Sequence, residues 1–237
     1  MSLVERYALL PEEIDQESLK LVQASLPRSL SLTPEEHYVV CRIVRAEGDV
    51  GIASAVHFSP GAVSKGVDAL QSGVEIITDV RMVEAGISKA LLKERGVSIR
   101  CAIDTPEVAE RARRDGTTRS VAAMRELAPY MNGAVVAVGN APTALLALLD
   151  LLDEGQARPS LVIGMPVGFV ACAEAKEELI RRPAPYITIS GLRGGSSAAA
   201  ATVNALLALA TTDSSPHPQS LSHSWERDGP EPAEGPG

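Results

Sequence analysis

The sequence predicts a three-layer α/β/α domain built on a mainly parallel five-stranded sheet, because short apolar runs alternate with helical segments through most of the chain. The apolar runs suit buried strands and occupy residues 74–78, 97–103, 134–138, 161–163 and 186–189. The helical segments between them occupy residues 106–114, 119–131, 142–154 and 173–181. Strands separated by helices imply right-handed crossovers and helices on both faces of the sheet. Aromatic residues make up only 3% of the chain, so the core must be aliphatic, which favours this class over a β-sandwich.

Further helices are predicted from start and stop signals. Residues 11–26 have amphipathic spacing. Residues 33–36 (TPEE) form a capping box with proline at the first helical position, and a similar signal predicts a helix over residues 59–71. The last helix, at 196–210, consists almost entirely of Ala, Leu and small polar residues. We therefore expect it to pack closely against the sheet or a partner.

One main domain is expected over residues 1–210, because a chain of 237 residues with 45% hydrophobic content can bury one substantial core. Residues 211–237 are rich in Pro, Ser, Gly and acids and are predicted to form a disordered acidic tail. This tail contains the only tryptophan, Trp225. Trp225 either belongs to a disordered extension or forms part of a short docking motif.

The net charge of −8 argues against a nucleic-acid-binding surface, which normally shows a basic stripe, and against adsorption to an anionic membrane. An anionic ligand therefore needs a local cluster of Arg and Lys side chains. No apolar stretch has the length of a membrane span, and no signal-type core follows a basic N-terminus. We expect a cytoplasmic protein.

The three cysteines lie far apart in the sequence, at Cys41, Cys101 and Cys172. Their spacing matches neither a disulfide framework nor a set of zinc ligands. We therefore expect buried free thiols in a reducing compartment and no metal site.

Two strand-to-loop segments are the strongest candidates for a ligand site. Residues 135–143 (VVAVGNAPT) and 161–170 (LVIGMPVGFV) each begin as a buried strand and end in Gly and Pro, which places a loop at the carboxyl end of a strand. Loops at that edge build ligand crevices in open α/β sheets. Asn140 in the first loop can either bind a ligand or cap the next helix. Thr78 and Asp79 end another strand at the same edge.

Residues 191–196 (GLRGGS) follow a predicted strand and precede a helix, so their backbone N–H groups can hold a phosphate or carboxylate. A tight strand-to-helix turn is the alternative. The segment departs from GxGxxG and from the P-loop pattern, since no Lys follows the final glycine. This departure weakens the interpretation of the chain as a nucleotide-binding domain of flavodoxin-like type.

These three segments, together with residues 58–63 (FSPGAV) and 116–120 (GTTRS), resemble the precorrin-8X methylmutase family of cobalamin biosynthesis. The resemblance runs in order from about residue 14 to about residue 209. It implies a flavodoxin-like topology, a homodimer, and an isomerase that moves a methyl group from C-11 to C-12 of precorrin-8X or cobalt-precorrin-8. It implies no cofactor and no metal of the protein's own, because any cobalt would arrive inside the substrate.

The expected tetrapyrrole substrate explains why arginines matter in this sequence. It carries several acetate and propionate groups, which guanidinium groups bind through paired hydrogen bonds. Arg42 and Arg45 are three residues apart on one predicted helix, so they share a face. Arg119 stands at a helix start, where the macrodipole disfavours a cation unless an anion is near; the resemblance implies that it binds a substrate carboxylate, and a salt bridge to a protein acid is the alternative. The expected substrate-binding residues are Arg42, Thr78, Asp79, Arg119, Ser120, Asn140, Thr143, Arg193, Gly194 and Ser196.

The position of Arg45 departs from the family pattern. The resemblance implies a stretch of the form Arg-x-x-His-Ala, whose His promotes the methyl migration as a proton or hydrogen-bond donor, whereas this chain reads RIVRA at 42–46. A histidine with a pKa of about 6.5 exchanges its proton near neutral pH, whereas an arginine, whose pKa lies far above neutral, keeps it. Loss of a general acid lowers a rate by about 10²- to 10⁴-fold, but a fixed donor can still stabilise developing charge. Arg45 is therefore either the catalytic polarising donor or the mark of a catalytically impaired corrinoid-binding carrier.

Structural roles are expected for three other polar residues. Glu174 and Lys176 flank a helix start and are interpreted as a solvated pair. His57 falls in a predicted connecting segment and is assigned to the surface, although it can reach a crevice.

Overall fold

The structure is a computed structural model that describes residues 11–211. Its strands form one six-stranded sheet in the order β1-β6-β5-β4-β2-β3. The strands are β1 (Val56–Phe58), β2 (Ile76–Thr78), β3 (Ile99–Arg100), β4 (Val135–Val138), β5 (Leu161–Gly164) and β6 (Tyr186–Ile189). Strand β1 runs antiparallel to β6, and the other neighbours are parallel. The five parallel strands follow the flavodoxin-like order, so the predicted fold class is confirmed.

The additional strand is β1, which the sequence analysis treats as part of a connection and a helix start. It has only three residues, too few for an alternating pattern, and its pairing with β6 joins segments about 130 residues apart. The Ser59 hydroxyl then accepts a hydrogen bond from the N–H of Tyr186 at 2.9 Å. Ser59 is therefore not the cap of the next helix, α4 (Ala62–Gln71), which begins after Gly61 in a left-handed conformation with φ of 69°.

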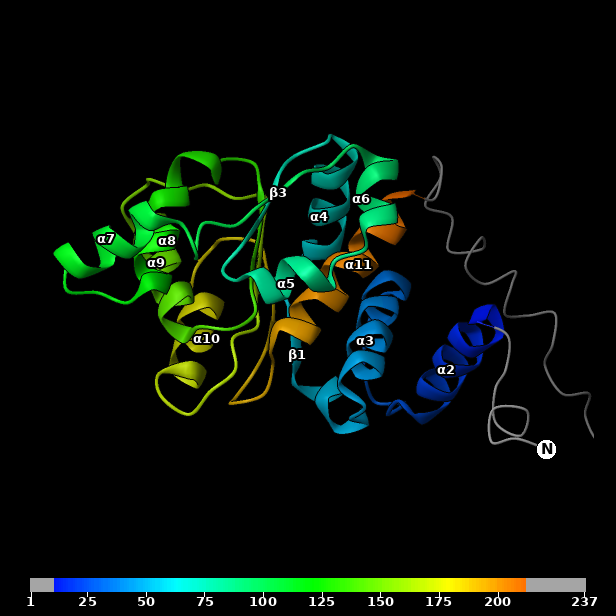
Figure 1. Cartoon of the computed structure of the whole chain (residues 1–237). Helices are drawn as coiled ribbons and strands as arrows, with labels where there is room; N and C mark the ends of the chain where they lie inside the picture. Colours follow the sequence, from blue (N-terminus) through cyan, green and yellow to red (C-terminus); the bar gives the residue numbers. More distant parts are fainter. Residues whose placement is uncertain (1–10, 212–237) are drawn as a thin grey trace, which may run out of the picture.

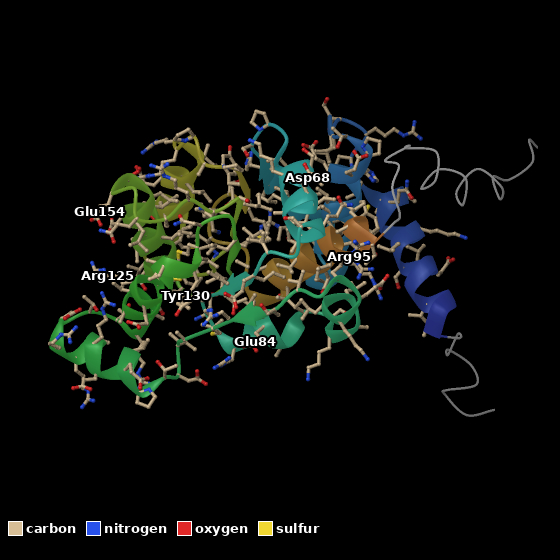
Figure 2. The ribbon with its side chains drawn as sticks, turned by 90° about the horizontal axis from the view of Figure 1, so that it is seen from above. Asp68, Glu84, Arg95, Arg125, Tyr130 and Glu154 are labelled. Atoms are coloured by element: carbon tan, nitrogen blue, oxygen red, sulfur yellow. The ribbon has the colours of Figure 1, made fainter. Side chains whose placement is uncertain are left out.

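Two helical layers cover the sheet (Figure 1). One layer contains α3 (Pro34–Glu47), α4, α5 (Arg81–Gly86), α6 (Lys89–Arg95) and α11 (Ser196–Thr211). The other contains α7 (Pro106–Arg114), α8 (Arg119–Leu127), α9 (Pro142–Asp153) and α10 (Cys172–Ile180). Figure 2 separates the same layers from above, with Asp68 and Arg95 on the first and Arg125 and Glu154 on the second. Helix α2 (Pro11–Ser25) packs outside α3, and two short 3-10 helices complete the chain, η1 (Val50–Ala55) and η2 (Ala128–Tyr130).

Helix α11 is the centre of the first layer, where it packs against α3, α4, α5 and α6. Its alanines permit this close approach, because a methyl group added at Gly86 would lie 2.7 Å from the Cβ of Ala200. The expectation of a closely packed last helix is confirmed. The capping box of α3 is also confirmed, with Thr33 and Glu36 bonded to each other's backbone N–H groups.

All three cysteines are free and buried, as expected. None of the helices in the described part of the chain has the length and apolar character that a membrane crossing needs. The predicted tail falls outside the described residues, apart from Thr211 at the end of α11, and so does Trp225.

Candidate functional site

The sheet has a switch point between β2 and β4. Strand β2 leads into α5 in one helical layer, whereas β4 leads into α9 in the other, so the two connections leave the sheet in opposite directions. Open α/β sheets bind ligands beside the carboxyl ends of the strands at such a point. We call this edge, where β2, β4, β5 and β6 end, the strand-tip edge. It is the candidate site.

Asp79 joins the tips of β2 and β4. It is 1% exposed, and its carboxylate accepts hydrogen bonds from the backbone N–H groups of Gly139 (3.0 Å), Asn140 (2.9 Å) and Ala141 (3.0 Å). Burial raises the pKa of Asp79, and the hydrogen bonds from these N–H groups oppose that shift. Both carboxylate oxygens are therefore occupied inside the protein.

This geometry changes the roles expected for Thr78 and Asp79. Their position at the end of a strand predicts that their side chains contact the ligand, but Thr78 is 0% exposed and the Asp79 carboxylate holds the loop after β4. Both residues lie beneath the site. We therefore propose that Asp79 positions the loop that contains Asn140 and does not itself bind the ligand.

The Asp79 environment gives a pH prediction. Because the folded-state pKa of Asp79 is raised, the folded state binds its proton more tightly than the unfolded state, and the associated stability is lost as pH rises from about 4 through the folded-state pKa. We expect the free energy of unfolding of the native protein, minus that of Asp79→Asn, to fall over this range. Urea unfolding at a series of pH values measures the difference. A difference that grows with pH would show that the three N–H groups lower the pKa of Asp79 by more than burial raises it.

Gly139 brings the tip of β4 against the start of α11. A Cβ at this position would lie 2.9 Å from the Cα of Ser196 and 2.6 Å from Cγ2 of Val83 in α5. Helix α9 begins directly after this loop, and its N-cap Ala141 makes no side-chain capping bond. Asn140 is exposed and is not the cap of α9. The geometry therefore removes the capping interpretation, and ligand binding by Asn140 stays a prediction.

The GLRGGS loop closes the strand-tip edge beyond β6. Gly194 has φ of 141° and packs against the carbonyl oxygens of Met165 and Pro166, while the N–H of Gly195 donates to Met165 at 2.8 Å. The guanidinium of Arg193 pairs with Asp49 at 2.5 Å. This ion pair is half exposed and therefore weak, but the guanidinium also donates to the carbonyl of Gly51 at 3.0 Å, so a ligand carboxylate would have to displace Asp49.

A cavity of about 350 Å³ lies between α3, the end of α5 and the first turns of α11. Its lining residues are Arg42, Arg45, Ala46, Gly86, Ser197, Ala200, Ala201 and Asn204. Arg42 and Arg45 thus face one cavity, as their spacing predicts. The Ser197 hydroxyl donates to Glu47 at 2.5 Å, which joins the last turn of α3 to the first turn of α11. The preceding residue, Ser196, lies against Gly139 at the tip of β4. The cavity therefore adjoins the strand-tip edge.

The remaining predicted residues lie on the other helical layer. Arg119 and Ser120 begin α8, and Thr143 lies in the first turn of α9. The hydroxyl oxygens of Thr118 and Thr143 are 3.3 Å apart, so the two helix starts meet at the same edge. Within residues 11–211, Arg119 is exposed and no acidic side chain pairs with it, which removes the salt-bridge alternative for that part of the chain. Arg119 does not line the cavity that contains Arg42 and Arg45.

For Lys176, too, the expectation from the sequence is wrong. It is not part of a solvated pair with Glu174 but is 0% exposed, and its Nζ donates to the carbonyls of Gly191 (2.9 Å) and Arg193 (2.5 Å). Burial lowers the pKa of Lys176. A signal was available, because Cys172, Ala175 and Leu179 share one face of α10 with Lys176 at helical spacing.

Neither of the two histidines within residues 11–211 enters this site. His57 is exposed on β1, and Nδ1 of His37 lies 3.6 Å from the thiol sulfur of Cys41. Neither residue lines the cavity. Across residues 11–211, no group of three or more His, Cys, Asp and Glu side chains is arranged to hold a metal ion.

Comparison with known proteins finds relatives of this chain over most of its length. A family model described as precorrin-8X methylmutase matches residues 13–209. The cobalt-precorrin-8 methylmutase of Priestia megaterium is 38% identical over 200 residues, which cover 84% of this chain and 88% of that protein. The precorrin-8X methylmutase of Pseudomonas aeruginosa is 43% identical over 167 residues, covering 70% and 80% of the two chains. The crystal structure of the Thermus thermophilus precorrin-8X methylmutase superposes with a TM-score of 0.78 at 39% identity, covering 84% of this chain and 96% of that one.

Proposed function

Because this chain belongs to the precorrin-8X methylmutase family, we propose that it is an isomerase of cobalamin biosynthesis that moves a methyl group from C-11 to C-12 of precorrin-8X or cobalt-precorrin-8. The reaction is intramolecular: the bond from the methyl group to C-11 breaks, and a bond to C-12 forms. It consumes no co-reactant. The observation that carries the proposal is the pair of partly buried arginines, Arg42 and Arg45, in a cavity beside the strand-tip edge.

Arg45 is proposed to act as a fixed cationic hydrogen-bond donor. A guanidinium keeps its proton throughout the physiological pH range, so it polarises the substrate without transferring a proton. A preorganised donor in a partly buried cavity stabilises the charge that develops as the methyl group migrates. Ser197 and Glu47 fix the wall of the cavity opposite α3.

The other arginines are proposed to bind the carboxylate side chains of the substrate. Pockets that enclose a drug-sized ligand measure about 300–1,000 Å³, so a cavity of about 350 Å³ encloses only one part of a tetrapyrrole. The rest of the ring then extends over the strand-tip edge. There Arg119 would bind one carboxylate, and Arg193 would bind another in exchange for Asp49. Asn140 and the starts of α9 and α11 belong to the same edge.

The test is conversion of the substrate by the native protein. Incubation with precorrin-8X, or with cobalt-precorrin-8 in a parallel assay, is expected to give the methyl-shifted product in many turnovers, followed by its absorption spectrum. Tight binding of one equivalent without turnover would instead support the corrinoid-carrier alternative, for which Arg45 is the motivating observation. Failure to bind either tetrapyrrole would overturn both proposals.

We also propose that two copies of the chain form a dimer through the strand-tip loops. Phe169 and Val170 are 89% and 82% exposed, and their loop contacts the next one through the N–H of Gly168 and the carbonyl of Leu192 at 3.3 Å. Apolar side chains exposed together in this way mark interaction surfaces. In sedimentation experiments, we expect a dimer for the native protein and a monomer for the double variant Phe169→Ser, Val170→Ser. A native protein that sediments as a monomer would contradict the proposal.

A further inference from the structure

We propose that Lys176 is a positioning residue, which orients two peptide units of the GLRGGS loop so that their N–H groups face a substrate carboxylate. The loop precedes α11 and closes the strand-tip edge. The proposal deepens the proposed function, and it depends on that function only for the identity of the ligand.

The first step is the contact between Lys176 and the loop. Its Nζ donates to the carbonyl oxygens of Gly191 at 2.9 Å and Arg193 at 2.5 Å, so one ammonium group holds alternate peptide units. Cys172, one turn earlier on α10, donates from its thiol to the carbonyl of Pro166 at 3.2 Å. The two side chains therefore join the loops that follow β5 and β6 from within the protein.

The second step follows from peptide geometry. In a trans peptide, the C=O and the following N–H point in opposite directions. Because the carbonyls of Gly191 and Arg193 point to Lys176, the N–H groups of Leu192 and Gly194 point to the opposite side of the loop. Neither of these N–H groups has a hydrogen-bond partner within residues 11–211. They are paired donors suited to an anion.

The third step concerns the charge of the buried ammonium. Within the described chain, Lys176 forms no ion pair with an acidic side chain, and it is 0% exposed. A buried charge without a counter-ion destabilises the protein, and this burial lowers the pKa of Lys176. This arrangement is explained if the ammonium stabilises both the conformation of the loop and an anion on its far side. Gly191, Gly194 and Gly195 all have positive φ, which glycine adopts readily, so the contacts of Lys176 select one conformation of a flexible segment.

The experiment compares Lys176→Met with a matched control. Methionine preserves most of the side-chain volume but removes both hydrogen bonds, so we expect KM for the tetrapyrrole to rise about tenfold or more while kcat changes less than about threefold. Leu148→Ala, which is buried in α9 in the other helical layer, serves as the control for general loss of stability. It is expected to lower the melting temperature while KM stays within about twofold. A Lys176→Met variant whose KM rises no more than that of the control would overturn the proposal.

A second measurement needs no substrate. Hydrogen exchange of the native protein is expected to show a protected Gly195 N–H, since it donates to Met165, and this protection should be lost in Lys176→Met but kept in Leu148→Ala. If Lys176→Met does not fold, Lys176→Gln retains one donor group and should give an intermediate KM. Loss of loop protection in a protein that binds no tetrapyrrole would support the positioning role and overturn the proposed function. Unchanged protection would overturn the positioning role.

Discussion

Replacing Arg45 by Gln is expected to lower kcat by about 10²- to 10³-fold, because it removes a fixed cationic donor from the cavity beside α11. Glutamine is uncharged and shorter than arginine, so the variant removes the charge together with the reach of the donor. KM should change much less, since Arg42, Arg119 and Arg193 remain to bind substrate carboxylates. Steady-state kinetics on the tetrapyrrole substrate measures both constants.

Arg113→Gln is the matched control for Arg45→Gln. Arg113 lies on α7 in the opposite layer, and within residues 11–211 its side chain donates only to the carbonyl of Ala109, at 3.3 Å from Nε. Its replacement makes the same change in net charge, and kcat should stay within about twofold. Equal rates for Arg45→Gln and the native protein would remove Arg45 from the mechanism.

Gly194→Ala is expected to cause the largest loss of stability and of substrate binding among single methyl additions at the strand-tip edge. The new Cβ would lie 2.6 Å from the carbonyl oxygen of Met165 and 2.9 Å from that of Pro166, and φ at this position is 141°. Both obstacles are backbone atoms, so the loop itself must move. We expect the free energy of unfolding to fall by about 3 kcal/mol or more, with KM raised in any protein that still folds. Chemical denaturation and substrate titration provide the two measurements.

Gly155→Ala separates backbone conformation from crowding. Gly155 also has positive φ, 69°, but no atom lies within 4 Å of an added Cβ. Only the left-handed conformation opposes alanine there, so a loss of about 1–2 kcal/mol is expected, with KM unchanged. If both alanine variants lose the same stability, the close approach of Gly194 to the two carbonyls has no energetic importance.

The fold was predictable where a single segment carries its own signal. The four apolar residues of β4 identify a buried strand without any partner, and Thr33 with Glu36 forms a capping box within one turn of α3. Strand β1 lacks such a signal, because three residues become a strand only when β6 lies beside them. The roles of Ser59 and Gly61 depend on that same pairing.

The site was predictable as a set of strand tips but not in its internal contacts. Arg42 and Arg45 meet in one cavity because they share a helix face, which the sequence encodes directly. Asp79 turns inward because N–H groups about 60 residues later in the chain bind its carboxylate, and no local pattern indicates this. Arg119 lies apart from the other two arginines because α8 follows β3 into the opposite layer.

The fixed-charge role of Arg45 is tested most directly by the pH dependence of kcat in the native protein and in Arg45→His. In the native protein, residue 45 should cause no decrease in kcat between about pH 5.5 and 8.5, because a guanidinium stays protonated throughout this range. The histidine variant should be active at the acidic end and lose activity as pH rises through about 6.5, where an imidazole releases its proton. A native protein that is inactive at every pH, beside an active Arg45→His variant, would contradict the account.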